Sequence, residues 1–221
     1  MSIPSSWPPV ADVQRWLSAE RFAPYLRSAG GNDTAAIELY EWNVAASGAF
    51  HEVLGQLEVL LRNAMHDELT RWHRRRGRTG SWFDDPSIRL SGTAVADVAK
   101  ARSRLRAPIT AGRVVAELPF GFWRYLLERR YQASLWPQAL QHGFPNLAGR
   151  RRREIVRNAV FDLHGLRNRI AHQEPIHSVD LARRQRQALE VAGYIDLGAH
   201  RWLGRLSRVP EVLDRRPLPR S

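Results

Sequence analysis

The feature that most limits the possible folds is a proline-free segment, residues 33–76. Its apolar side chains recur three and four positions apart, which is the spacing of a helix face that packs against a core. They are Phe50, Val53, Leu54, Leu57, Leu60, Leu61, Ala64, Met65 and Trp72. The segment therefore predicts one long amphipathic helix, with Gly48 as the place for a break.

The remainder of the sequence also follows helical periods punctuated by proline and glycine, and very little of it resembles a strand. The predicted helices are 11–28 with an interruption near Pro24, 93–106 ended by Pro108, two short helices within 111–136 divided by Pro119 and Gly121, 149–171, and 179–197 capped by Ser178. The simplest architecture is one all-α helical bundle over residues 1–208. The proline- and arginine-rich residues 209–221 are expected to form a loosely ordered tail.

Composition narrows the class of protein further. An apolar content of 43% in 221 residues is enough for a sizeable core, yet no apolar run approaches the ~20 residues that a membrane-spanning helix needs. The first residues lack the basic start and apolar stretch of a secretory signal, so a cytoplasmic location without membrane contact is expected. Cysteine is absent, which excludes disulfides, thiolate metal ligands and cysteine nucleophiles.

Charge is the most uneven property of the composition. The sequence has 34 basic and 22 acidic residues and a formal net charge of +12. Lys100 is the one lysine, so arginine supplies the other 33 positive charges. Arginine grips phosphate with two parallel hydrogen bonds and stacks on bases. A polyanionic partner, RNA in particular, is therefore expected, although arginine bias also arises from genome composition and many basic residues are merely solvated.

Residues 166–176, which read LRNRIAHQEPI, hold the candidate catalytic pair. Arg167 is followed by four residues and then His172, at the end of a predicted core helix. RNA carries its own nucleophile, the 2′-hydroxyl, so its cleavage needs proton transfer and stabilisation of charge on the phosphoryl oxygens. Histidine titrates near neutrality and arginine matches phosphate geometry. We therefore assign proton transfer to His172 and phosphate stabilisation to Arg167.

Several blocks beside this pair carry a resemblance to a known family. The blocks are LEVLLRNA at 57–64, AELPFGFWR at 116–124, Trp136, the dipeptide at 144–145, and LRNRIAH at 166–172. In this order they resemble the Abi-like family of abortive-infection proteins, of the AbiD and AbiF type, in the HEPN ribonuclease superfamily. The resemblance extends from about residue 40 to about residue 203.

The resemblance implies a HEPN-like helical bundle with additional helices and a metal-independent, toxin-like endoribonuclease of anti-phage defence. It implies that Asn168, whose equivalent is often polar in HEPN proteins, orients a catalytic group or the substrate. It also implies no cofactor, an RNA substrate, and a restraining antitoxin that is either a small RNA or a protein.

The spacing of the catalytic pair adds a geometric requirement. Residues five apart on a regular helix differ by about 140° around its axis, so Arg167 and His172 do not share one face. Either the last helical turn unwinds before Pro175, or facing groups from another helix complete the site. HEPN relatives bring paired motifs together at a dimer interface, so a homodimer with a composite basic cleft is expected.

A second polar constellation lies on the long predicted helix. Glu58, Arg62 and His66 are four residues apart and form one stripe away from the main apolar face. The plainer interpretation is a salt bridge between Glu58 and Arg62 with His66 as a bystander. The alternative is that Glu58, Arg62 and Asn63 support one wall of the cleft.

Three alternatives to a metal-independent ribonuclease remain open from the sequence. A metal site at His164, His172 and His177 lacks the spacing of a known metal motif, and His177 is instead expected to line the cleft. A helical module that binds RNA without cutting it would show steep salt dependence. A regulatory subunit of a defence system could dock through the aromatic residues 120–125, although a cluster of this kind more often forms core.

Overall fold

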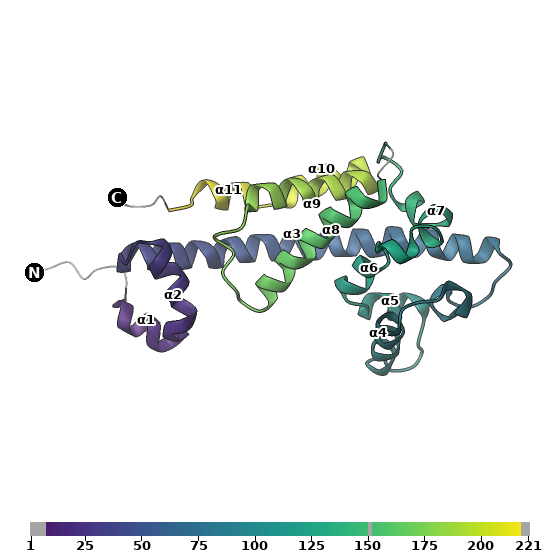
Figure 1. Ribbon diagram of the computed structural model, residues 1–221, viewed down its shortest axis with the longest axis horizontal. Helices are drawn as coiled ribbons and strands as arrows, with labels where there is room; N and C mark the ends of the chain where they lie inside the picture. The colour runs from purple at the N-terminus through teal and green to yellow at the C-terminus, as the bar shows by residue number, and fades with distance from the viewer. Residues whose placement is uncertain (1–7, 150–151, 218–221) are drawn as a thin grey trace, which may run out of the picture. The chain divides into compact units, whose positions relative to one another are not determined.

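The structure is a computed structural model that describes residues 8–149 and 152–217, and in this part of the chain it is all-α (Figure 1). The α-helices are α1 Val10–Leu17, α2 Ala19–Ser28, α3 Asp33–Arg75, α4 Gly92–Ser103, α5 Ala111–Glu117, α6 Phe120–Tyr125, α7 Leu135–Gln138, α8 Arg152–Ala171, α9 Leu181–Ile195, α10 Leu197–Leu206 and α11 Val209–Asp214. Short 3-10 turns occur at Trp82–Asp84, Pro86–Ile88, Arg129–Tyr131 and Leu140–Gly143. The prediction of an all-α fold is confirmed.

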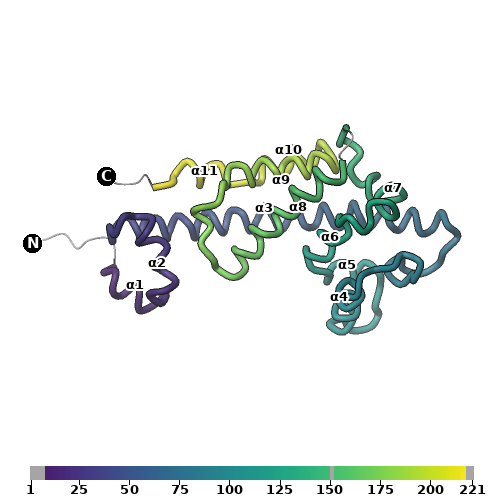
Figure 2. Tube along the Cα trace, viewed as in Figure 1, coloured from purple at the N-terminus to yellow at the C-terminus, as the bar shows by residue number. Residues whose placement is uncertain are grey.

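Helix α3 is the long amphipathic helix that the sequence predicts. It runs unbroken from Asp33 to Arg75, through Gly48, as the trace in Figure 2 shows. Its apolar stripe is almost wholly buried, with Phe50, Leu57 and Leu61 at 0% exposure. The period of the stripe is maintained on both sides of Gly48, so burial along the whole face outweighs the cost of one glycine, about 1 kcal/mol.

The N-terminal helical region breaks at a different residue from the one predicted. Pro24 lies inside α2, whereas the chain breaks at Ser18, which has a φ of 71°. A positive φ is incompatible with a continuing right-handed helix. The Ser18 hydroxyl then accepts a hydrogen bond from the Arg21 backbone N–H at 3.3 Å and caps α2. The expected interruption near Pro24 is therefore wrong.

Two differences from prediction lie toward the end of the chain. Helix α9 begins at Leu181 rather than at residue 179, and the carboxylate of Asp180, not the hydroxyl of Ser178, accepts from the Arg183 backbone N–H at 2.9 Å. Helix α11 occupies part of the segment expected to be a loose tail. Its first turn contains Pro210, whose fixed φ suits a helix start. Residues 218–221 of that tail lie outside the described residues.

The described residues divide into two compact units. Unit 1 comprises the residues up to 52, 166–185 and those from 207 on, and unit 2 comprises 53–165 and 186–206. Helices α3, α8 and α9 each contribute residues to both units. The core of unit 1 includes Phe22, Tyr25, Trp42, Phe50 and Ile176. The core of unit 2 includes Trp82, Phe120, Phe122, Trp123 and Phe144.

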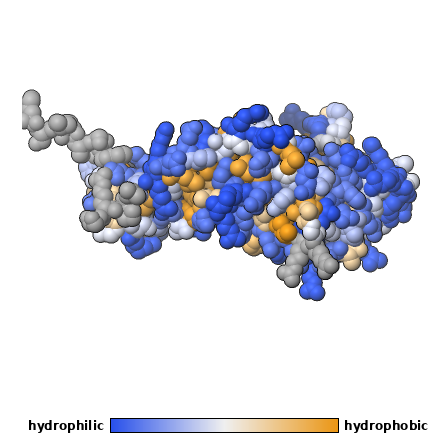
Figure 3. All heavy atoms as spheres, turned by 90° about the horizontal axis from the view of Figure 1, so that it is seen from above, coloured by the Kyte–Doolittle hydropathy of each residue, from blue (hydrophilic) through white to orange (hydrophobic). Residues whose placement is uncertain are grey.

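The face shown in Figure 3 is mostly hydrophilic, with apolar side chains exposed between the polar ones. The large apolar residues with substantial exposure are Trp16, Val44, Val95, Ile109, Tyr125, Ile155, Phe161, Leu197, Trp202 and Leu206. Within residues 8–149 and 152–217, no helix combines the length and apolar content that crossing a membrane requires.

Candidate functional site

The candidate catalytic residues lie at the C-terminal end of α8, in unit 1. The helix stays regular there, because the His172 backbone N–H still donates to the Asn168 carbonyl at 3.0 Å. It closes one residue later, where Gln173 has a φ of 54° and the Glu174 N–H donates to the Arg169 carbonyl at 2.8 Å. This is the hydrogen-bond pattern of a Schellman helix end.

The regular end of α8 excludes one of the two geometries considered for the catalytic pair, an unwound last turn. The last turn does not unwind before Pro175, so Arg167 and His172 project about 140° apart around the helix axis. His172 is exposed, and Arg167 and Asn168 are half-buried. None of these three side chains forms a hydrogen bond or ion pair with another described residue. All three are therefore available to a ligand or to a second protein chain, but they are not assembled into one cluster.

The segment that follows α8 is tied down by one buried side chain. Asn43 on α3 is 5% exposed, and its Oδ1 accepts from the backbone N–H groups of Ile176 at 2.8 Å and His177 at 3.1 Å. Ile176 is itself fully buried. Because a buried N–H without a partner is costly, Asn43 fixes where the chain turns from α8 toward α9.

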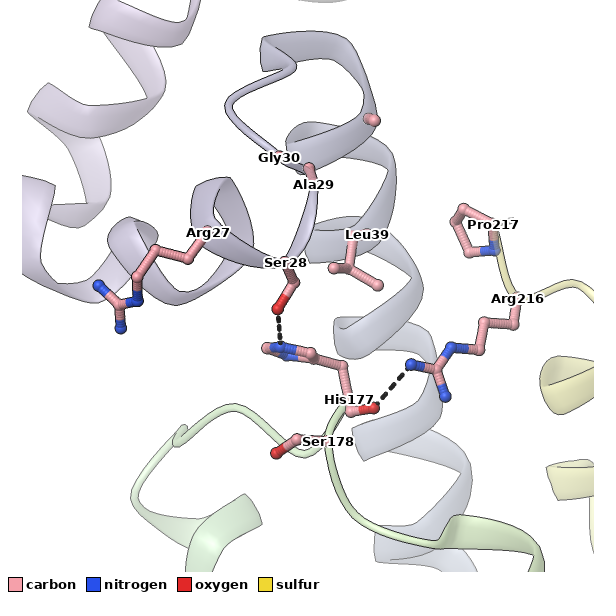
Figure 4. Close-up of a pocket in the computed structure, with 10 residues that line it drawn as sticks. Arg27, Ser28, Ala29, Gly30, Leu39, His177, Ser178, Arg216 and Pro217 are labelled. Atoms are coloured by element: carbon pink, nitrogen blue, oxygen red, sulfur yellow. Dashed lines mark hydrogen bonds between the residues drawn. The ribbon is translucent and has the colours of Figure 1, made fainter. Parts of the chain in front are cut away.

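His177, which the sequence predicts to line the cleft, is buried in unit 1 (Figure 4). Its Nε2 lies 3.0 Å from the Ser28 hydroxyl, and its carbonyl oxygen accepts from Arg216 Nη2 at 2.9 Å. Burial lowers the pKa of His177 below its ordinary value of 6.5, and the nearby positive charges of Arg216 and Arg169 lower it further. The ring is therefore neutral at neutral pH.

Two cavities in unit 1 share His177 as a lining residue. One has a volume of about 540 Å³ and the other about 410 Å³. Both are also lined by Arg27, Ser28 and Ser178. Neither is lined by Arg167 or His172, so the cavities do not coincide with the candidate catalytic pair. Sequence reasoning missed Arg27, Ser28 and Arg216, because nothing in a local pattern joins segments so far apart in the chain.

The second predicted constellation belongs to unit 2. Arg62 is half-buried and donates from Nη1 to the Ala116 carbonyl at 3.2 Å, while Asn63 is exposed. His66 Nδ1 accepts from the indole N–H of Trp82 at 2.9 Å, and burial lowers its pKa. Arg62 and His66 thus hold neighbouring elements of unit 2 together. Glu58 is half-buried on the same helix.

The aromatic residues 120–125 mainly form core. Phe120, Phe122 and Trp123 are at most 1% exposed, whereas Tyr125 is 39% exposed. The guanidinium of Arg124 lies 4.1 Å from the Tyr125 ring centroid. The interpretation of this cluster as core is confirmed for its three buried members.

The described residues contain no group of three or more histidine and acidic side chains placed to hold a metal ion. Comparison of the chain with protein-family models, with curated proteins and with solved structures finds no match.

Proposed function

We propose that the chain is a metal-independent endoribonuclease in which His172 and Arg167 act on the RNA 2′-hydroxyl and phosphate. The observation that carries the proposal is that His172 is exposed and Arg167 half-buried, both without a side-chain partner among the described residues, at the end of a regular helix in a chain of net charge +12. The 2′-oxygen attacks phosphorus as its proton passes to a base, and the P–O5′ bond breaks as the 5′-oxygen gains a proton. The products are a 2′,3′-cyclic phosphate and a 5′-hydroxyl.

Each group has one task in this reaction. His172 transfers protons, because imidazole accepts and donates near neutral pH. Arg167 stabilises negative charge on the phosphoryl oxygens, since its guanidinium is always charged and matches their geometry. Asn168, one position along the helix, orients the substrate. Separation of the pair by about 140° favours a homodimer in which Arg167 of one copy serves His172 of the other.

The resemblance described above supports the biological part of the proposal. We place the chain among HEPN-type toxins of abortive infection, acting in the cytoplasm on RNA and restrained by an antitoxin. The antitoxin is a small RNA or a protein, and the positive charge of the chain suits an RNA or an acidic protein.

Incubation of the purified chain with total RNA in EDTA tests the chemistry. His172→Ala should lower the cleavage rate by about 10²–10⁴-fold, because general acid–base catalysis contributes that much. Arg167→Ala should lower it by about 10²–10³-fold. The exposed residues His51 and Arg186 offer matched controls, since His51→Ala and Arg186→Ala remove the same groups elsewhere. Tight binding without cleavage would instead indicate an RNA-binding module.

A mixture of the two inactive variants tests the composite site. Subunits carrying Arg167→Ala and His172→Ala, unfolded and refolded together, form mixed dimers in which one of the two sites is intact. Because half of the dimers are mixed, activity should return to about a quarter of the parent value. No recovery, with dimers present by analytical ultracentrifugation, would show that both residues act from the same chain.

A further inference from the structure

The two cavities around His177 form a site that the cleavage chemistry does not use. They share four lining residues, Arg27, Ser28, His177 and Ser178, and so adjoin each other. The larger, about 540 Å³, lies in the size range of small-molecule sites, about 300–1,000 Å³. It is far larger than a single phosphate ion needs.

The lining of these cavities is positively charged. Arg27 and Arg216 line the larger cavity, and Arg27 and Arg169 line the smaller one. No acidic side chain lines either cavity within the described part of the chain. An anion placed here would therefore meet arginine donors without an adjacent carboxylate to repel it.

Arg216 is held in a fixed position before any ligand binds. Its guanidinium lies 5.0 Å from the Trp42 ring centroid. Its Nη2 donates to the His177 carbonyl at 2.9 Å, a hydrogen bond drawn in Figure 4. The Trp42 indole N–H in turn donates to the Val212 carbonyl at 2.8 Å, which anchors α11. A guanidinium has five N–H groups, so this arrangement leaves donors free for a ligand.

His177 lies in the wall that the two cavities share. The residue is 6% exposed, and its Nδ1 is buried with no hydrogen-bond partner among the described residues. The Ser28 and Ser178 hydroxyls lie on the same lining. The larger cavity is also lined by the apolar residues Ala35, Leu39 and Pro217.

We propose that this pocket binds the phosphate-bearing end of a nucleotide, with the phosphate on Arg216 and the nucleoside along the apolar residues of the lining. The ligand is either a free 5′-mononucleotide or the 5′-phosphorylated end of an RNA chain, because the two share this chemistry. The site goes beyond the proposed cleavage, since neither Arg167 nor His172 lines it.

Isothermal titration calorimetry of the full chain with adenosine and uridine 5′-monophosphate tests the pocket. Adenosine and inorganic phosphate, each with half of the ligand, should bind at least about tenfold more weakly. Arg216→Gln should weaken mononucleotide binding about tenfold or more, since it removes a charged donor. Arg215→Gln removes a neighbouring exposed arginine that does not line the pocket, and should bind as the parent does.

A second variant that fills the cavities tests the proposal even if an arginine variant fails to fold. Ser178 is exposed and lines both cavities, so Ser178→Tyr should obstruct them without entering the core, and an unchanged melting temperature would verify its fold. Unmeasurable binding of mononucleotides at millimolar concentration would overturn the proposal. Parent-like affinity in both Arg216→Gln and Ser178→Tyr would also overturn it.

Short 2′-O-methyl RNA oligonucleotides, which lack the attacking hydroxyl, identify the source of the phosphate. The natural ligand is an RNA end if a 5′-phosphorylated tetranucleotide binds more tightly than the mononucleotide, while the same tetranucleotide with a 5′-hydroxyl does not. If the mononucleotide binds at least as tightly, the ligand is a free nucleotide. Mononucleotide binding by calorimetry and RNA cleavage in EDTA are separate measurements, so a failure of the pocket and a failure of the cleavage proposal are distinguishable.

Discussion

His177 is held in place through its backbone as much as through its ring. Asn43 accepts its amide hydrogen, Arg216 donates to its carbonyl oxygen, and Ser28 contacts Nε2. The ring also lies 5.0 Å from that of Tyr25, centroid to centroid. With its position set by three neighbours, the imidazole cannot easily turn toward solvent when it gains a proton. Protonation of His177 must therefore cost free energy in the folded state.

This cost predicts a loss of stability in mild acid. Below the ordinary pKa of 6.5, the unfolded chain binds a proton at His177 that the folded chain, with its lowered pKa, does not. The free energy of unfolding should therefore fall as the pH drops toward the lowered pKa, and the contribution of His177 to the slope should fade within about one pH unit above 6.5. Urea unfolding between about pH 7.5 and pH 5 measures it, and His177→Gln should show a shallower fall than the parent. Part of the fall should remain, because the pKa of His66 is lowered too. Equal slopes for parent and variant would contradict the prediction.

Helix positions were largely predictable from the sequence, and helix ends were less so. The apolar stripe of α3 and the stripe of α8 are local patterns, and burial of each stripe is enough to specify a helix. The end between α8 and α9 contains two competing cap residues, Ser178 and Asp180. Asp180 is the residue that caps α9. Asn43 binds the backbone of Ile176 and His177, and these two residues are buried, so the chain before Asp180 is kept out of the helix. That outcome depends on a residue of another helix, which no local pattern reveals.

Substitution at the start of α9 should show which residue caps it. Asp180→Ala should lower the free energy of unfolding by about 1 kcal/mol, since it removes the acceptor for the Arg183 N–H. Ser178→Ala, two positions earlier, is the matched control and should change it by less than about 0.5 kcal/mol. Chemical denaturation followed by circular dichroism measures both. A larger effect from Ser178→Ala than from Asp180→Ala would indicate that Ser178 caps α9, as expected from the sequence.

Only the part of the candidate site that lies on a single helix was predictable from the sequence. The sequence placed Arg167 and His172 at a helix end, and the structure has them there, on a regular last turn. The pocket around His177 depends instead on α2, the segment after α8, and the segment after α11. Three such segments meet only through packing of the whole unit. Their side chains carry no common spacing in the sequence.

For the whole molecule, the excess of arginine predicts how RNA affinity responds to salt. Each phosphate contact with single-stranded RNA contributes about −0.7 to the slope of log K against log salt concentration. For about five contacts, affinity should fall about 100-fold between 50 and 200 mM salt. Fluorescence anisotropy with a labelled 2′-O-methyl RNA measures the slope. A flat response would show that the net charge of +12 does not drive RNA binding.

Unit 1 is assembled from three separate stretches of the sequence, so its packing is completed late in synthesis. Residues up to 52 leave the ribosome first, yet they cannot complete their packing until residues 166–185 and those from 207 on have followed. Domains generally fold as units during translation, and this one has to wait for nearly the whole chain. The nascent protein therefore carries an unfinished His177 pocket until the residues around Arg216 emerge, and a ribosome stalled before that point holds a chain in which the proposed nucleotide site does not exist.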